Sequence, residues 1–294
     1  MTDKEYLEAV LKNQDLKDDS PELKDLQKER ANVEKLLRAG FPDCSPTIRY
    51  GGSKPKNTLI KENYDLDIAS YFPHDDTSAG ETLNEIYDNT EKALTGEYNV
   101  VRKRTALRLR SKKDVDFHID VVPGRFTDDD KSDCFLHQEG SDKDRLKTNL
   151  DVHIEHIRDS GFVPAIRVLK LWKTRKALDV KQFAFELLIV KLLDGTDKSL
   201  PEQVKYIWTE LRDPAEPVAI EDPANPTGND LSDLLNETVW ADLSAVAKST
   251  LATLENDGWE AIFGKVSSGD DKAEKAQRAA ATVIAPSRPW LPRE

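Results

Sequence analysis

The sequence has few cysteines, no long apolar run and no excess of basic residues, and each absence argues against a class of protein. Its 294 residues include two cysteines, Cys44 and Cys134, which form no CxxC or Cys/His cluster with the spacing of a zinc site. No apolar stretch approaches the length that crosses a bilayer, and the first residues lack the pattern of a signal peptide. We therefore expect a cytoplasmic protein with no membrane partner.

Acidic residues outnumber basic ones, with 55 Asp and Glu against 43 Lys and Arg and a net charge of −12. Proteins that coat nucleic acids need a basic field, so this balance argues against that class, although a local basic groove is compatible with it. The contents of 38% hydrophobic and 33% charged residues indicate a globular protein. The length suits one large domain or two closely packed ones.

The pattern predicts a mixed first half and a helical second half. Residues 3–39 are predicted to be helical with a break at DDSP, where Ser20 is the expected N-cap and Pro21 the first helical residue. Alternation and apolar content predict the strands 65–72, 98–104, 105–111 and 115–123, with a helix at 80–94. The helices expected afterwards are 145–160, 163–176, 181–195, about 233–256 and 270–283.

We therefore expect two domains, 1–144 and 145–294, with a ligand site in the cleft between them.

The stretch YGGSKPKNTLIKENYDLDIASYF, residues 50–72, joins a Gly-Gly-Ser turn to an Asp-x-Asp pair at the start of an apolar strand. Asp65 and Asp67 are two residues apart, so on a strand they point to the same face and can hold the same metal ions. Mg²⁺ prefers oxygen ligands, and carboxylates supply them. A third carboxylate is expected from a neighbouring strand, with Asp120 as the candidate and Asp116 as the alternative on the same face.

The residues before this pair are suited to gripping phosphate. Gly51 and Gly52 allow close approach of the backbone, and Ser53 adds a hydroxyl and backbone amides. Lys56 and Thr58 could add a charge and a hydrogen bond. Nucleotidyl transfer requires alignment, charge neutralisation and usually two divalent ions, which this combination could supply.

Each part alone has an ordinary structural explanation. A Gly-Gly-Ser is usually just a turn, and an isolated Asp-x-Asp usually lies on a solvated surface. The ordered set is much rarer by chance, because a carboxylate buried without a partner beside apolar residues is costly. The basic run RKRTALRLRSKK, residues 102–113, could line a nucleotide cleft, bind an RNA strand or form a solvated sheet face.

With these motifs in order, the sequence resembles nucleotidyltransferases of the polymerase-β superfamily. More narrowly, it is similar to oligoadenylate synthetases and to the bacterial CD-NTases, the cyclic oligonucleotide synthases of CBASS anti-phage defence. The resemblance extends over about 51–230, and DVVPGRF selects Asp120 over Asp116. The segments that carry it are GGSKPKNTLIK, DVVPGRF, IRVLKLWK, QFAFELLIV and DPANPTGND.

The resemblance implies an α+β fold: a polymerase-β-type mixed sheet with N-terminal helices, followed by a helical lobe. It implies that Asp65, Asp67 and Asp120 are catalytic and bind two Mg²⁺ ions, with Mn²⁺ as an alternative. The nucleotide-binding residues that it implies or supports are Gly52, Ser53, Lys56, Thr58, Arg167, Lys170 and Gln182.

We therefore expect an enzyme that joins NTPs into a cyclic or short linear oligonucleotide and releases pyrophosphate. The product would be a second messenger for a downstream effector in anti-phage defence. The acidic balance argues against activation by RNA. Two alternatives stay open: nucleotide addition to a tRNA or protein, and a catalytically silent nucleotide sensor. Composition indicates no oligomeric state.

Overall fold

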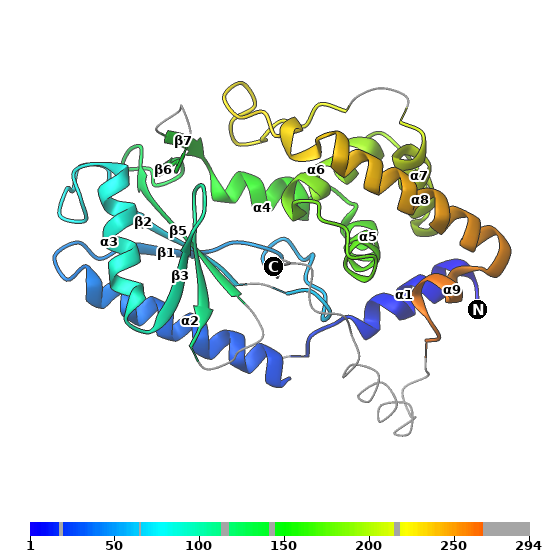
Figure 1. The fold of residues 1–294 in the computed structure, drawn as a ribbon, viewed down its shortest axis with the longest axis horizontal. Coiled ribbons are helices and arrows are strands. Elements are labelled where there is room, and N and C mark those ends of the chain that lie inside the picture. Colours follow the sequence, from blue (N-terminus) through cyan, green and yellow to red (C-terminus); the bar gives the residue numbers. More distant parts are fainter. Residues whose placement is uncertain (18–19, 65, 113–117, 141–144, 215–217, 267–294) are drawn as a thin grey trace. The chain divides into compact units, whose positions relative to one another are not determined.

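The computed structural model describes residues 1–17, 20–64, 66–112, 118–140, 145–214 and 218–266, which belong to two compact units (Figure 1). The sheet unit comprises Leu16–Val163 and Ile220–Leu231. The helical unit comprises Met1–Asp15, Pro164–Ala219 and the chain from Ser232 onward. This division differs from the boundary expected at residue 144, because the first helix packs with the helices of the second half and 145–163 stay with the sheet.

Seven strands form one sheet in the described part of the sheet unit. They are β1 (Thr47–Tyr50), β2 (Leu66–Phe72), β3 (Tyr98–Arg102), β4 (Leu107–Ser111), β5 (His118–Phe126), β6 (Cys134–His137) and β7 (Arg145–Thr148). The order is β1-β2-β5-β4-β3, and β6 pairs with both β5 and β7. β2 and β5 run parallel, and the other paired strands run antiparallel. The expected mixed α+β fold is confirmed.

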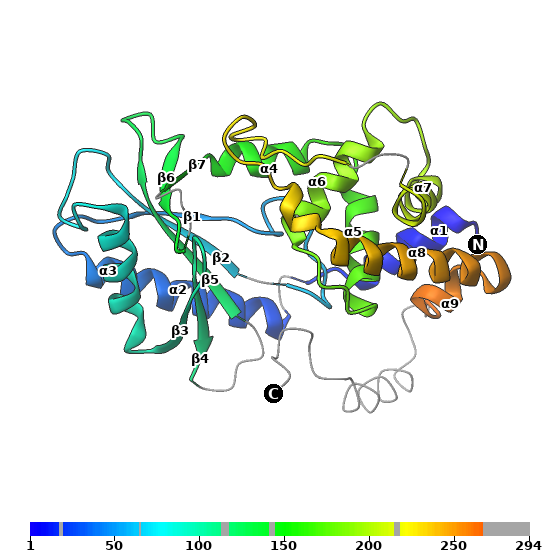
Figure 2. The ribbon, with the colours of Figure 1, turned by 45° about the horizontal axis from the view of Figure 1, so that its top comes forward.

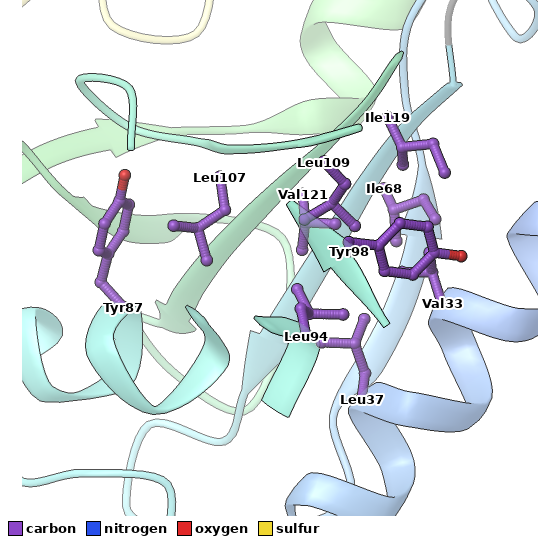
Figure 3. Packing of buried hydrophobic residues seen from close by; sticks show 10 residues of the cluster. All are labelled: Val33, Leu37, Ile68, Tyr87, Leu94, Tyr98, Leu107, Leu109, Ile119 and Val121. Carbon is purple, nitrogen blue, oxygen red and sulfur yellow. The ribbon is translucent and has the colours of Figure 1, made fainter. Parts of the chain in front are cut away.

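Two helices, α2 (Pro21–Gly40) and α3 (Leu83–Thr95), lie side by side and cover one face of the sheet (Figures 1 and 2). The expected start of α2 is confirmed, since the Ser20 side chain accepts from the Leu23 amide and Pro21 is the first helical residue. Figure 3 shows the apolar cluster between helices and sheet. Its buried residues are Val33, Leu37, Ile68, Tyr87, Leu94, Tyr98, Leu107, Leu109, Ile119 and Val121.

This cluster fixes the face of the sheet on which two of the predicted carboxylates lie. Ile119 and Val121 on β5 are buried in it, so Asp120, which stands between them, lies on the opposite face. The same alternation places Ile68 in the cluster and Asp67 on the opposite face of β2. The alternation expected for residues 118–123 is confirmed.

The helical unit is built from α1 (Asp3–Asn13), α5 (Val163–Arg175), α6 (Gln182–Leu193), α7 (Leu200–Arg212), a 3-10 helix (Ser232–Leu235), α8 (Glu237–Asp257) and α9 (Trp259–Phe263). Trp172 lies in its core, and its indole nitrogen donates to the Thr250 hydroxyl at 2.9 Å. The Tyr6 hydroxyl donates to the backbone oxygens of Trp259 and Gly264, which ties α1 to α9. No helix in the described ranges is long and apolar enough to cross a membrane.

The elements after β5 differ from the expected ones. Residues 145–160 were expected to be one helix, but Arg145–Thr148 form β7 and the helix α4 (Leu150–Arg158) begins after Asn149. The Asn149 side chain accepts from the amides of Asp151 and Val152, so it is the N-cap that fixes this start. The strand β6 was not expected, and the helix expected at 270–283 lies outside the described residues.

Candidate active site

The pairing of β2 with β5 brings together two of the predicted catalytic carboxylates. Asp67 and Asp120 are register partners on these parallel strands, and both are half-buried. Neighbouring strands lie about 4.8 Å apart, so the two carboxylates can contribute to one site. Asp65, the third predicted ligand, lies outside the described residues, as does the alternative Asp116.

The Asp120 carboxylate is held by a residue of the basic run 102–113 that the sequence did not single out. Arg108 on β4 is the register partner of Asp120, and its Nε donates to Oδ1 at 2.8 Å while its Nη2 donates to Oδ2 at 2.6 Å. The side chains of Arg108 and Asp120 are 25% and 19% exposed. The alternating run TALRLRS could have indicated this residue, because alternation places Arg108 on the face of the strand opposite to the buried Leu107 and Leu109.

The Gly-Gly-Ser turn lies directly against Asp67. The Gly51 amide donates to the Asp67 backbone oxygen at 3.0 Å. Gly52 has φ +75°, a conformation that favours glycine, and a Cβ there would stand 2.0 Å from Asp67 Oδ2. The structure therefore joins the predicted phosphate turn to the predicted metal ligand, and a side chain at position 52 would collide with that carboxylate.

The rest of this turn is folded onto itself. The Thr58 amide donates to the Ser53 backbone oxygen at 2.9 Å. Ser53, Lys56 and Thr58 are all buried, and Thr58 is fully so. Such burial fits side chains that support the turn, and a direct contact of Lys56 or Thr58 with a nucleotide stays a prediction.

The nucleotide ligands predicted in the second half belong to the helical unit and already have protein partners. Arg167 Nη2 donates to Asp15 Oδ1 at 2.6 Å. Gln182 accepts from Lys173 Nζ at 3.1 Å and donates to Glu186 Oε1 at 3.2 Å. Lys170 is buried on α5. Their role as nucleotide ligands stays a prediction.

The loop that carries DPANPTGND is fastened to α4 within the sheet unit. Asp222 is buried, its Oδ1 lies 2.5 Å from His153 Nε2, and its Oδ2 accepts from Asn229 at 2.8 Å. Burial alone would raise the pKa of Asp222, but the hydrogen bonds and charge of His153 and the bond from Asn229 outweigh it and lower that pKa. Asp222 therefore joins Asn229, in the same loop, to His153 on α4.

Asp67 and Asp120 fit a magnesium site in chemistry and position. Carboxylate oxygens are the ligands that Mg²⁺ prefers, and the pair faces away from the apolar cluster beside a turn whose backbone can approach phosphate. Among residues with described placement, no group of three His, Cys, Asp or Glu side chains is assembled for a metal, and Asp65 is not among them. The site would therefore need Asp65 or the phosphates of a nucleotide to complete its ligands.

No protein-family model matches the chain, and no curated protein matches it. Solved structures do match its fold. CdnC from E. coli MS115-1, in a complex with HORMA-deltaN, has a TM-score of 0.65 at 20% identity, covering 91% of this chain and 99% of that one. CdnG, a CD-NTase from Bradyrhizobium diazoefficiens in complex with GTP, has a TM-score of 0.65 at 14% identity. The match covers 95% of this chain and 97% of that one.

A third match is the DncV cyclic AMP-GMP synthase of Vibrio cholerae in complex with the linear intermediate 5′ pppA(3′,5′)pG. Its TM-score is 0.59 at 19% identity, with 91% of this chain and 82% of that chain covered. These TM-scores show a shared fold. The chain has the fold of the CD-NTases, as the sequence motifs indicated.

Proposed function

We propose that the protein is a metal-dependent nucleotidyltransferase that joins NTPs into a cyclic or short linear oligonucleotide. The observation that carries the proposal is the register of Asp67 with Asp120 beside the Gly52 turn, on the fold of the CD-NTases. Catalysis of this class rests on alignment and charge neutralisation, which these groups are suited to supply.

The carboxylates of Asp65, Asp67 and Asp120 would hold two Mg²⁺ ions, or Mn²⁺ in their place. When bound, these ions neutralise the triphosphate and lower the pKa of the attacking hydroxyl. The turn at Gly52 and Ser53 would bring backbone amides to the phosphates, since Gly52 has no side chain to hold them away from Asp67.

In the reaction, a ribose hydroxyl of one nucleotide loses its proton and attacks the α-phosphorus of another. An O–P bond forms, the bond between the α-phosphorus and the bridging oxygen breaks, and pyrophosphate leaves. Repetition gives a linear oligonucleotide. Attack by the product's own hydroxyl closes a ring.

The remaining nucleotide ligands in this proposal are Lys56 and Thr58 at the turn and Arg167, Lys170 and Gln182 on α5 and α6. The three cationic side chains suit phosphate, and the Gln182 amide suits a base edge. Arg167 would exchange its bond with Asp15 for a phosphate contact.

We propose the second-messenger role in bacterial anti-phage defence on the shared fold with CdnC, CdnG and DncV. The product would then act on a downstream effector in the cytoplasm. The net charge of −12 supports a synthase that needs no RNA activator.

The test is incubation of the purified chain with all four NTPs and Mg²⁺ or Mn²⁺, followed by phosphatase treatment and mass spectrometry. Phosphatase-resistant oligonucleotides, absent with Asp67→Asn, support the cyclic product, and phosphatase-sensitive ladders support the linear one. The matched control is Asp25→Asn on the exposed side of α2, which should leave products unchanged. No product with any NTP or dNTP would overturn the proposal in favour of a macromolecular acceptor or a silent sensor.

A further inference from the structure

The pair of Arg108 and Asp120 places a permanent positive charge inside the candidate metal site. Across the sheet, Asp67, Asp120, Arg108 and Val101 are successive register partners on β2, β5, β4 and β3. The guanidinium donates to both oxygens of the Asp120 carboxylate, so it lies at hydrogen-bond distance from a predicted cation ligand.

This arrangement has two physical consequences. The planar fork of an arginine fixes the plane and rotamer of a carboxylate, which a lysine ammonium cannot do. The same positive charge reduces the negative potential that would attract a divalent cation to Asp120 and Asp67. The first effect favours catalysis, while the second weakens cation binding.

We propose that Arg108 is a positioning residue that holds Asp120 in its productive orientation and keeps the nucleotide-free site weak for divalent cations. Firm cation binding then requires the negative charge of an incoming triphosphate, so that cation and NTP bind together. The part of this proposal that concerns NTP rests on the proposed function.

A purely structural Arg108 would behave differently. If the pair served only to join β4 to β5, removing the arginine would loosen Asp120 and weaken cation binding. If the charge matters as proposed, removing it strengthens cation binding while the loss of orientation lowers turnover. The two roles therefore predict opposite changes in one measurable quantity when Arg108 is replaced: the affinity of the nucleotide-free chain for a divalent cation.

The chain contains a matched control for this measurement. Arg158 and Asp159 form the same fork, with Nε to Oδ1 and Nη2 to Oδ2 both at 2.8 Å. Their side chains are 39% and 59% exposed, so this pair lies in solvent rather than at the carboxylate site. Arg158→Gln removes the same charge and the same bonds from a surface position.

The experiment is a titration of the full chain with Mn²⁺ alone, in which electron paramagnetic resonance reports free Mn²⁺. Asp67→Asn should abolish one binding event, and that loss assigns the event to the site. Arg108→Gln should bind Mn²⁺ at least about threefold more tightly than the unaltered chain, because a unit charge near the ligands is removed. Arg108→Lys, which keeps the charge, and Arg158→Gln should stay within about twofold.

Unchanged or weaker Mn²⁺ binding at this site in Arg108→Gln would overturn the proposal, as would Mn²⁺ binding that is the same in Asp67→Asn as in the unaltered chain. If circular dichroism shows that Arg108→Gln does not fold, the test of the positioning role rests on Arg108→Lys. It should keep the Mn²⁺ affinity and lose turnover, and a joint loss of both would contradict the positioning role.

The titration requires no turnover, so its outcome is separate from that of the proposed function. If the chain makes no product but Arg108→Gln binds Mn²⁺ more tightly, the proposed role of Arg108 is supported and the proposed synthase activity is contradicted. The coupling to nucleotide is read by repeating the titration with a non-hydrolysable ATP analogue. The analogue should tighten Mn²⁺ binding in the unaltered chain more than in Arg108→Gln.

Discussion

Asp67 on β2 and Asp120 on β5 stand directly opposite each other, and the apolar residues on either side of Asp120 hold them there. Ile119 and Val121 are buried in the cluster beneath α2 and α3 (Figure 3). A slip of one residue would turn Asp120 into that cluster and expose its apolar neighbours, which is costly. The geometry of the candidate site is therefore a consequence of hydrophobic burial on the other face of the sheet.

Val121→Ala should destabilise the protein by about 2 kcal/mol, because it removes buried methyl groups and leaves a cavity in this cluster. Urea unfolding followed by circular dichroism measures the loss. Val101→Ala is the matched control, since Val101 on the edge strand β3 is 39% exposed and should cost less than about 0.5 kcal/mol. Equal losses in the two variants would contradict this account of the register.

Gly52→Ala should reduce product formation at least about 100-fold, because the new Cβ would collide with Asp67 Oδ2 and displace a carboxylate that must be aligned. Initial rates with saturating NTP measure the effect. The control is Gly161→Ala, which adds the same methyl group at φ +82° with no atom within 4 Å. A similar loss of rate in both variants would show that backbone strain alone is responsible.

The local features of the candidate site could be predicted from sequence, while its long-range pairings could not. The alternation around Asp120 and the glycines before Asp67 are local patterns, and the structure brings the two together. The bond from Arg108 to Asp120 depends on β4 lying beside β5, a strand order that no local pattern states. The register of a sheet is decided by burial of its whole apolar face.

The same reason explains two other differences. Residues 145–148 form a strand because they pair with β6. This pairing outweighs the helical preference that the pattern of the short segment indicated. The first helix belongs with the helical unit because Tyr6 bonds backbone oxygens of Trp259 and Gly264, far along the chain. In both cases, contacts with residues outside the segment itself decided the outcome.

Asp222→Asn should remove a pH-dependent contribution to stability. The folded-state pKa of Asp222 lies below its ordinary value of 3.8, so its ionised form is favoured by folding. The groups facing it are His153, Asn229 and the Ala224 amide. This contribution is present above about pH 4 and is lost as the pH falls through the lower folded-state pKa.

The measurement is the free energy of unfolding of both proteins in urea between pH 5 and pH 2.5. At pH 5 the variant should be less stable by about 2 kcal/mol, the cost of weakening a buried charged hydrogen bond. The difference should shrink as the pH falls below 4. A difference that stays constant over this range would show that Asp222 contributes no titratable stability.

Removal of divalent cations should abolish product formation, because the triphosphate charge is then not neutralised. Treatment with EDTA, followed by addition of Mg²⁺ or Mn²⁺ in excess, measures loss and recovery. A second readout needs no turnover: with a non-hydrolysable ATP analogue present, added Mn²⁺ should raise the melting temperature. Asp67→Asn and Asp120→Asn should lose this rise, whereas full activity in EDTA would exclude the metal-dependent mechanism.

The ion pair of Arg167 with Asp15 allows the predicted nucleotide role of Arg167 to be separated from a structural one. The bond is 2.6 Å long, and the side chains are 17% and 57% exposed. Such a pair contributes about 0–1 kcal/mol, so breaking it costs little stability whichever partner is replaced. If Arg167 binds phosphate, Arg167→Ala should raise the KM for NTP at least about tenfold, the value of one charged hydrogen bond. Asp15→Ala breaks the same pair but keeps the guanidinium, so its KM should stay unchanged or fall. Equal increases of KM in the two variants would show that Arg167 acts through its pair with Asp15 and contacts no nucleotide.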